Sequence, residues 1–113
     1  MNYLLSLSLA NGGYRHAYAK IRSPDRLAEA TEALIAKGKT PSPPVVVISE
    51  LSAYGQDALF RALPTKVFRH RFKMMEGGEM LDWESSDKRH NDRLLKLHKE
   101  EASPSVAFTG TQS

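Results

Sequence analysis

Tyr3-Leu4-Leu5-Ser6-Leu7-Ser8-Leu9-Ala10, followed by Asn11-Gly12-Gly13, is the stretch that decides the fold of this chain. Every second residue from Tyr3 to Leu9 is apolar, and this period of two is typical of a strand with one buried face. The Asn-Gly-Gly sequence supplies the positive φ angles that a hairpin turn requires. A second strand is therefore expected from Tyr14 to Ile21, so the chain begins with a β-hairpin.

Two registers of this hairpin fit the turn. A two-residue loop at Asn11-Gly12 would place Leu9 opposite Tyr14 and Leu7 opposite His16. We favour a three-residue loop with a glycine bulge, because it gives the more apolar face. In that register Leu5, Leu7 and Leu9 lie beside Ala19, Ala17 and Arg15, and Tyr3 lies opposite Ile21. The outer face then carries Ser6, Ser8, Tyr14, His16, Tyr18 and Lys20.

Further elements follow in alternation along the chain. Ser23-Pro24-Asp25 is a strong helix start, and Gly38 suits the end of a helix that runs to about Lys37. The expected elements after it are a buried strand at 45–48, a helix at 52–63, a strand at 66–74, a short strand at 80–83 and a helix from about 85 to 101. This order predicts an α+β or α/β fold, with a single sheet of about four to five strands packed against two or three helices.

The length of 113 residues fits one globular domain, expected at residues 1–101. Ser, Thr, Pro, Gly and Gln dominate from residue 102 onward, so residues 102–113 are predicted to form a disordered tail.

Composition is that of an ordinary soluble protein, with 41% hydrophobic and 26% charged residues. The net charge of +3 is mildly basic, and the absence of cysteine excludes disulfides, zinc–thiolate sites and thiol nucleophiles. No apolar run reaches the length of a membrane span, and the apolar start lacks the basic region of a signal peptide. We expect a cytoplasmic location, or the host cytoplasm for a viral protein.

A cationic stretch at residues 66–74 is the first candidate binding surface. As a strand it would place Phe68, His70, Phe72 and Met74 on one face, and Arg69, Arg71 and Lys73 on the other. The last helix adds Arg89, Arg93, Lys96 and Lys99. Such a cationic surface suits either nucleic-acid phosphates or an acidic protein, although nearby acidic residues partly neutralise it.

The outer face of the hairpin is the second candidate surface. Flat rings accept unstacked bases, while a neighbouring cation meets the backbone. Tyr14, His16, Tyr18 and Lys20 match that description. Aromatic residues are common in strands, however, so packing against a helix or a dimer mate explains the same pattern.

The order of elements resembles that of RNase H-like nucleases, and 45–50 resembles their strand with a metal-binding carboxylate, here Glu50. Such a site needs several carboxylates around two cations. Asp57 and Asp87 are further candidates, but the first strand carries Ser6 and Ser8 where the family has an acid. The four histidines lack metal-ligand spacing. No metal, cofactor or catalytic residue is therefore assigned.

The sequence thus favours a small non-enzymatic binding protein, with nucleic acid ahead of protein as the ligand. An accessory inhibitor or adaptor that binds a larger protein or nucleoprotein complex is the alternative, and a degenerate or divergent RNase H-like nuclease is the second. An exposed edge strand, or an apolar patch around Trp83, would support a homodimer.

Overall fold

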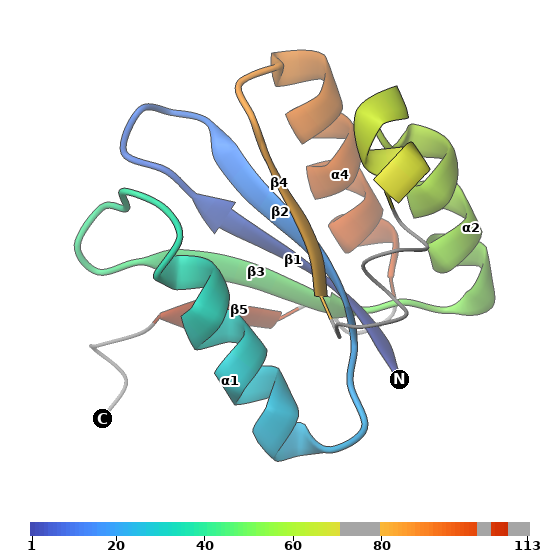
Figure 1. Cartoon of the computed structure of the whole chain (residues 1–113), viewed down its shortest axis with the longest axis horizontal. Coiled ribbons are helices and arrows are strands. Elements are labelled where there is room, and N and C mark those ends of the chain that lie inside the picture. Colours follow the sequence, from blue (N-terminus) through green and yellow to red (C-terminus); the bar gives the residue numbers. More distant parts are fainter. Residues whose placement is uncertain (71–79, 102–104, 109–113) are drawn as a thin grey trace.

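The computed structural model describes residues 1–70, 80–101 and 105–108, which form one five-stranded antiparallel sheet with helices on both faces (Figure 1). α1 (Pro24–Ile35) covers one face, while α2 (Ala53–Ala62) and α4 (Lys88–Glu100) lie side by side on the other. The predicted α+β class, with an initial β-hairpin, is confirmed. The strands, in the spatial order β4-β2-β1-β3-β5, are β1 (Asn2–Ser8), β2 (Tyr14–Lys20), β3 (Val45–Glu50), β4 (Met80–Ser85) and β5 (Ser105–Phe108).

The hairpin register differs from both predicted registers. Ser8 lies opposite Tyr14 and Leu5 opposite Ala17, so the favoured register has the correct faces but is displaced by two residues. The loop has three residues, as in the favoured register, but they are Ala10, Asn11 and Gly12, because Leu9 N donates to Gly13 O at 2.9 Å and Gly12 N donates to Leu9 O at 3.1 Å. Gly12 has a φ of 88°, which supplies the positive φ that the turn requires. Leu9 therefore belongs to the paired part of the hairpin, and its side chain is buried in one cluster with Leu34 of α1.

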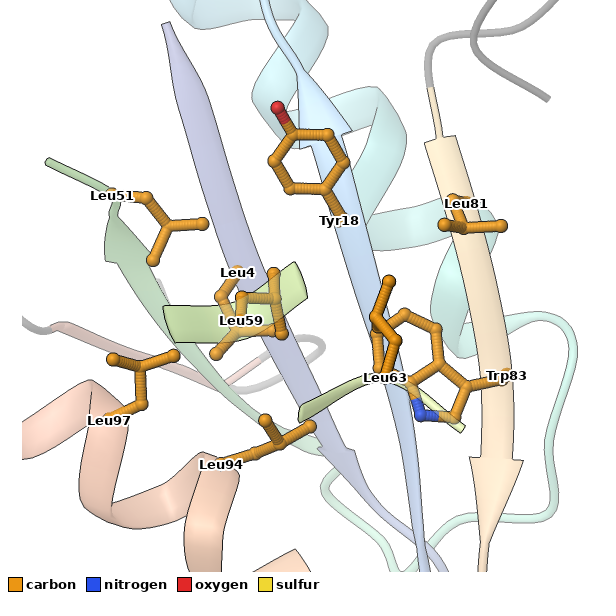
Figure 2. Packing of buried hydrophobic residues seen from close by; sticks show 9 residues of the cluster. All are labelled: Leu4, Tyr18, Leu51, Leu59, Leu63, Leu81, Trp83, Leu94 and Leu97. Atoms are coloured by element: carbon orange, nitrogen blue, oxygen red, sulfur yellow. The ribbon is translucent and has the colours of Figure 1, made fainter. Parts of the chain in front are cut away.

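Each face of the sheet has its own hydrophobic cluster, because alternate side chains of a strand point to opposite faces. The α1-side cluster contains Leu5, Leu7, Leu9, Ala17, Ala19, Ile21, Leu34, Val46 and Ile48. Figure 2 shows the α2/α4-side cluster, in which the helices contribute Leu59, Leu63, Leu94 and Leu97, and the sheet and the end of β3 contribute Leu4, Tyr18, Leu51, Leu81 and Trp83.

Side-chain caps fix the starts of the two helices on that face. Ser52 Oγ accepts a hydrogen bond from Gly55 N at 3.0 Å at the start of α2. Asp87 accepts from Arg89 N at 3.0 Å and from His90 N at 3.3 Å at the start of α4. The last helix therefore begins after Ser86 rather than at it, because β4 extends to Ser85 and Asp87 is the cap.

The predicted cationic strand is wrong where the structure describes it, because residues 65–70 are helical. Phe68 N donates to Pro64 O at 2.9 Å, which is a helical bond, and Val67 packs against the α2/α4-side cluster. The alternation of basic with other residues over 68–74 favoured a strand, but so short a run does not exclude a helix. Residues 71–74 lie outside the described residues.

The expected tail from residue 102 includes part of the sheet. β5 pairs with β3, with Val45 opposite Phe108 and Ile48 opposite Ser105. Within the predicted tail, residues 105–108 thus form the edge strand of the sheet, and the rest of the tail lies outside the described residues. Nor does any helix in the described part of the chain have the length and apolarity needed to cross a bilayer.

Candidate functional site

The exposed face of α4 unites three of the predicted site residues. Arg89, Arg93 and Lys96 are all exposed and stand at positions i, i+4 and i+7, which places them in one row along the helix. At 1.5 Å per residue the row extends over about 10 Å. The opposite face of α4 points Leu94 and Leu97 into the α2/α4-side cluster, so the amphipathic pattern of the helix fixes the row toward solvent.

A groove between α2 and α4 adjoins this row, with a hollow of about 310 Å³. Its floor is apolar and comes from Ala58, Ala62, Leu94 and Leu97, and Tyr54 lies at its edge with 73% of its surface exposed. A second hollow of about 680 Å³ lies around the start of α4. Arg93 lines both hollows, Lys96 lines the first and Arg89 the second.

The charges in the groove are unequally compensated. In the groove, Arg61 of α2 pairs with Asp57 at 2.8 Å, and Glu100 is the other acidic residue of the lining. Outside the groove, Lys88 pairs with Asp92 along α4 at 2.8 Å. Arg89, Arg93 and Lys96 form no ion pair within the part of the chain that the structure describes. The row therefore has hydrogen-bond donors and positive charge available for an anionic ligand.

The predicted aromatic platform on the hairpin is not exposed. His16 and Tyr18 are 0% and 1% exposed, because α2 and α4 cover that face of the sheet. Tyr14 is half-buried and stacks on His16 with ring centroids 5.6 Å apart. Only Lys20, at the end of β2, is exposed. The prediction of an outward-facing stacking surface is therefore wrong, and these rings cannot receive a base in this structure.

Of the basic residues predicted in the cationic stretch, the structure describes Arg69 but not Arg71 or Lys73. Arg69 is exposed in the helical segment 65–70. The candidate surface is consequently formed by α4 and α2.

A buried polar chain on the other side of α4 is a second feature of this region. Hydrogen bonds join, in order, Ser49 of β3, His98 of α4, Ser6 of β1, His16 of β2 and Asn91 of α4. The four separations are 2.7 Å for the first and 2.8 Å for the others. Asn91 also donates to Ser85 O of β4 at 3.1 Å, so the chain connects α4 to four strands.

Simple chemistry fixes the direction of every bond in the chain. Ser85 O is a carbonyl, so Asn91 must turn Nδ2 toward it and Oδ1 toward His16. His16 therefore donates from Nε2 and accepts at Nδ1 from the Ser6 hydroxyl. Ser6 in turn accepts from His98 Nε2, and His98 Nδ1 accepts from the Ser49 hydroxyl. With both rings neutral, each ring nitrogen and each hydroxyl proton in the chain has a partner.

Burial keeps both rings neutral. Desolvation lowers the pKa of His16 to about 4, against a smaller opposite effect of the Asn91 hydrogen bond. Desolvation, together with a smaller effect of the nearby His16, lowers the pKa of His98 to about 4 as well. At neutral pH the chain is thus an uncharged, fully bonded link between helix and sheet.

Serine hydroxyls bonded to imidazoles also occur in activated nucleophiles. Ser6 and Ser49 are both 0% exposed, however, so a substrate cannot reach either oxygen in this structure. The chain is a structural link, and it lies outside the groove.

The carboxylates suggested by the nuclease resemblance lie on separate elements. Glu50 is near the Tyr3 hydroxyl at 3.5 Å, Asp57 pairs with Arg61, and Asp87 caps α4. Across the residues described, no three His, Asp or Glu side chains converge as a metal site requires.

Sequence reasoning missed Tyr54 and the polar chain. No sequence pattern around Tyr54 marked it as a residue of an exposed site. Asn91, Leu94 and His98 do follow one helical stripe, at i, i+3 and i+7, and this spacing could have indicated two polar residues facing the sheet.

Comparison with known proteins adds no assignment. No protein-family model matches the chain, and no curated protein or solved structure matches it either.

Proposed function

We propose that this chain is a non-enzymatic binding protein that takes nucleic acid, through its phosphate backbone, along the exposed face of α4. The observation that supports the proposal is the exposed row of Arg89, Arg93 and Lys96, which form no ion pair with any other described residue. Helix α4 has five Lys or Arg residues and two acidic residues, which concentrates positive charge on one element of a chain whose net charge is only +3. Neutralised phosphates release counterions, so such a row favours binding most at low salt.

The exposed ring of Tyr54 supports nucleic acid as the ligand. It lies on the rim of the same groove as Arg93 and Lys96, so a base could stack on it while the backbone meets the cations. Tyr54 therefore takes the place of Tyr14, His16 and Tyr18 as the aromatic part of the proposed surface.

A protein ligand is the second candidate, supported by the apolar floor of the groove. Ala58, Ala62, Leu94 and Leu97 lie between two antiparallel helices, which is the setting in which an amphipathic helix binds. An acidic helix would satisfy both the floor and the basic row. This candidate corresponds to an inhibitor or adaptor that docks on a larger assembly.

Fluorescence anisotropy with labelled single-stranded and double-stranded oligonucleotides, titrated at two salt concentrations, tests the proposal. We expect binding that weakens as salt rises. No binding of either oligonucleotide at low salt would overturn the nucleic-acid proposal and leave the acidic protein partner.

The variant Tyr54→Ala tests the stacking role. We expect weaker binding of the single strand, by about 1–3 kcal/mol for one stacked base, with the salt dependence unchanged. Because the side chain is exposed, the fold should tolerate its loss, and a circular dichroism spectrum checks this. The variant Tyr54→Phe is the matched control, because it keeps the aromatic ring. Phe60→Ala is unsuitable as a control, because the Phe60 ring packs on the Tyr18 ring with centroids 5.1 Å apart. Equal affinity of Tyr54→Ala and wild type would rule out stacking on this residue.

A further inference from the structure

We propose that acid releases α4 from the sheet by breaking the buried chain of Ser49, His98, Ser6, His16 and Asn91, and thereby removes the binding face that α4 carries. The release of α4 is inferred from these buried hydrogen bonds alone. Only its consequence for binding rests on the proposed function.

The buried hydrogen-bond chain has no free acceptor for an additional proton. Protonated His16 would donate from Nδ1 to Ser6 Oγ, which already accepts from His98, and the Ser6 hydroxyl proton would lose its acceptor. Protonated His98 would likewise turn the Ser49 hydroxyl away from Nδ1. Each protonation therefore leaves a buried donor unpaired in addition to burying a charge.

Among the residues that the structure describes, none offers a counterion to either ring. On α4, His90 is the titratable neighbour of His16, with the rings 5.5 Å apart, and it can only add positive charge. Asp87, at the start of α4, is engaged by the helix backbone, and Arg93 of α4 points into the groove. Glu101, just after α4, contacts Ser52.

The carboxylates of the strands and of α2 lie away from His16 and His98 or are paired with other residues. On the far face of the sheet, Asp82 of β4 binds Arg15 of β2 at 2.8 Å and Lys37 at 2.9 Å. Glu84 of β4 and Glu50 of β3 share that face by strand alternation. On α2, Asp57 pairs with Arg61. A proton on the chain is therefore uncompensated while α4 is docked, and water can solvate it once α4 leaves.

The two-sided fold lets one face loosen before the other. The α1-side cluster contains no histidine, and α1 reaches the sheet through apolar contacts. The α2/α4-side cluster shares its face with His16 and His98, and Trp83 lies there with its ring 5.8 Å from that of His16. Trp83 Nε1 also donates to His90 Nε2 of α4 at 3.0 Å, so the surroundings of the indole change when α4 moves.

Amide hydrogen exchange of the whole chain without nucleic acid, at about pH 7 and about pH 5, tests the release. After correction for intrinsic rates, we expect protection of the α4 amides to fall on the order of 100-fold and to drop below that of the α1 amides, because two histidines gain protons on opening. Trp83 emission should shift to the red over the same range. Protection of α4 that is unchanged, or that stays equal to that of α1 at both pH values, would overturn the inference.

Replacement of one of the two buried histidines tests whether they cause the fall in α4 protection. The glutamine amide has an NH2 group that donates and a carbonyl oxygen that accepts, but it does not titrate. His98→Gln should therefore reduce the fall in α4 protection to roughly the effect of a single histidine, on the order of tenfold. His70→Gln is the matched control, because His70 is exposed, and it should behave like wild type. If His98→Gln does not fold, the wild-type exchange decides the matter. Absence of oligonucleotide binding at neutral pH would contradict the proposed function alone and leave the release of α4 standing.

Discussion

The Tyr18 hydroxyl is buried in the α2/α4-side cluster, and no described residue donates to it or accepts from it. A buried polar atom without a partner costs about 1–3 kcal/mol. We therefore expect Tyr18→Phe to leave the free energy of unfolding unchanged or to raise it by up to about 1 kcal/mol, because the ring contact with Phe60 remains. Urea unfolding measures the difference. A loss of stability above about 1 kcal/mol would reveal a partner for the hydroxyl.

Single residues also mark where prediction from sequence stops. Ser6 and Ser8 occupy the same strand face and have the same side chain, yet Ser6 is fully buried and Ser8 is not. The difference arises from His98 and His16, which reach Ser6 from distant parts of the chain. Alternation could therefore predict the face of each residue correctly, but not whether a helix covers that face.

At the scale of elements, Glu101 connects the end of α4 to the start of α2. Its carboxylate contacts Ser52 N and Ser52 Oγ at 3.4 Å, beside the positive end of α2. A Cβ at Gly55 would collide with this carboxylate, so the absence of a side chain at Gly55 makes the contact possible.

This geometry predicts non-additive substitutions. In wild type, Gly55→Ala should displace Glu101, and the lost contact should offset the gain of about 1 kcal/mol that alanine gives over glycine in a helix. In a Glu101→Ala background, the same Gly55→Ala change should stabilise by about 1 kcal/mol. Urea unfolding of the four proteins gives the coupling energy. Equal effects of Gly55→Ala in both backgrounds would contradict the contact.

Elements differ in how well the sequence specifies them. α1 and α2 begin close to the positions predicted from Ser23-Pro24 and from Ser52, because helix-capping signals depend only on neighbouring residues. Residues 65–70 were wrongly predicted as a strand, since the docking of Val67 decides that segment and depends on the assembled core. The row on α4 was predictable from its spacing, whereas the groove beside it required the packing of α2.

For the whole molecule, the buried histidines predict a pH-dependent stability. An unfolded histidine has a pKa of about 6.5, and in the fold the pKa of His16 and of His98 is about 4. Between these values the unfolded chain binds more protons, so stability is complete above about pH 6.5 and falls as pH falls toward 4. The slope approaches about 1.4 kcal/mol per pH unit for each histidine.

Urea unfolding at a series of pH values between 7 and about 5 measures this slope. The variant His70→Gln should reproduce the wild-type curve, because His70 is exposed. A free energy of unfolding that stays constant over this range would contradict the burial of two neutral rings.

The proposed function of the molecule depends on contact between the basic row on α4 and phosphates. The most direct test is the slope of log K against log salt concentration, measured by anisotropy with one oligonucleotide for wild type, Arg93→Ala and Arg26→Ala. Arg26 lies on α1, on the opposite side of the sheet, so Arg26→Ala removes the same charge from a different surface. We predict that Arg93→Ala reduces the magnitude of the slope by about 1 and that Arg26→Ala leaves it unchanged. Equal slopes for wild type and Arg93→Ala would contradict this contact.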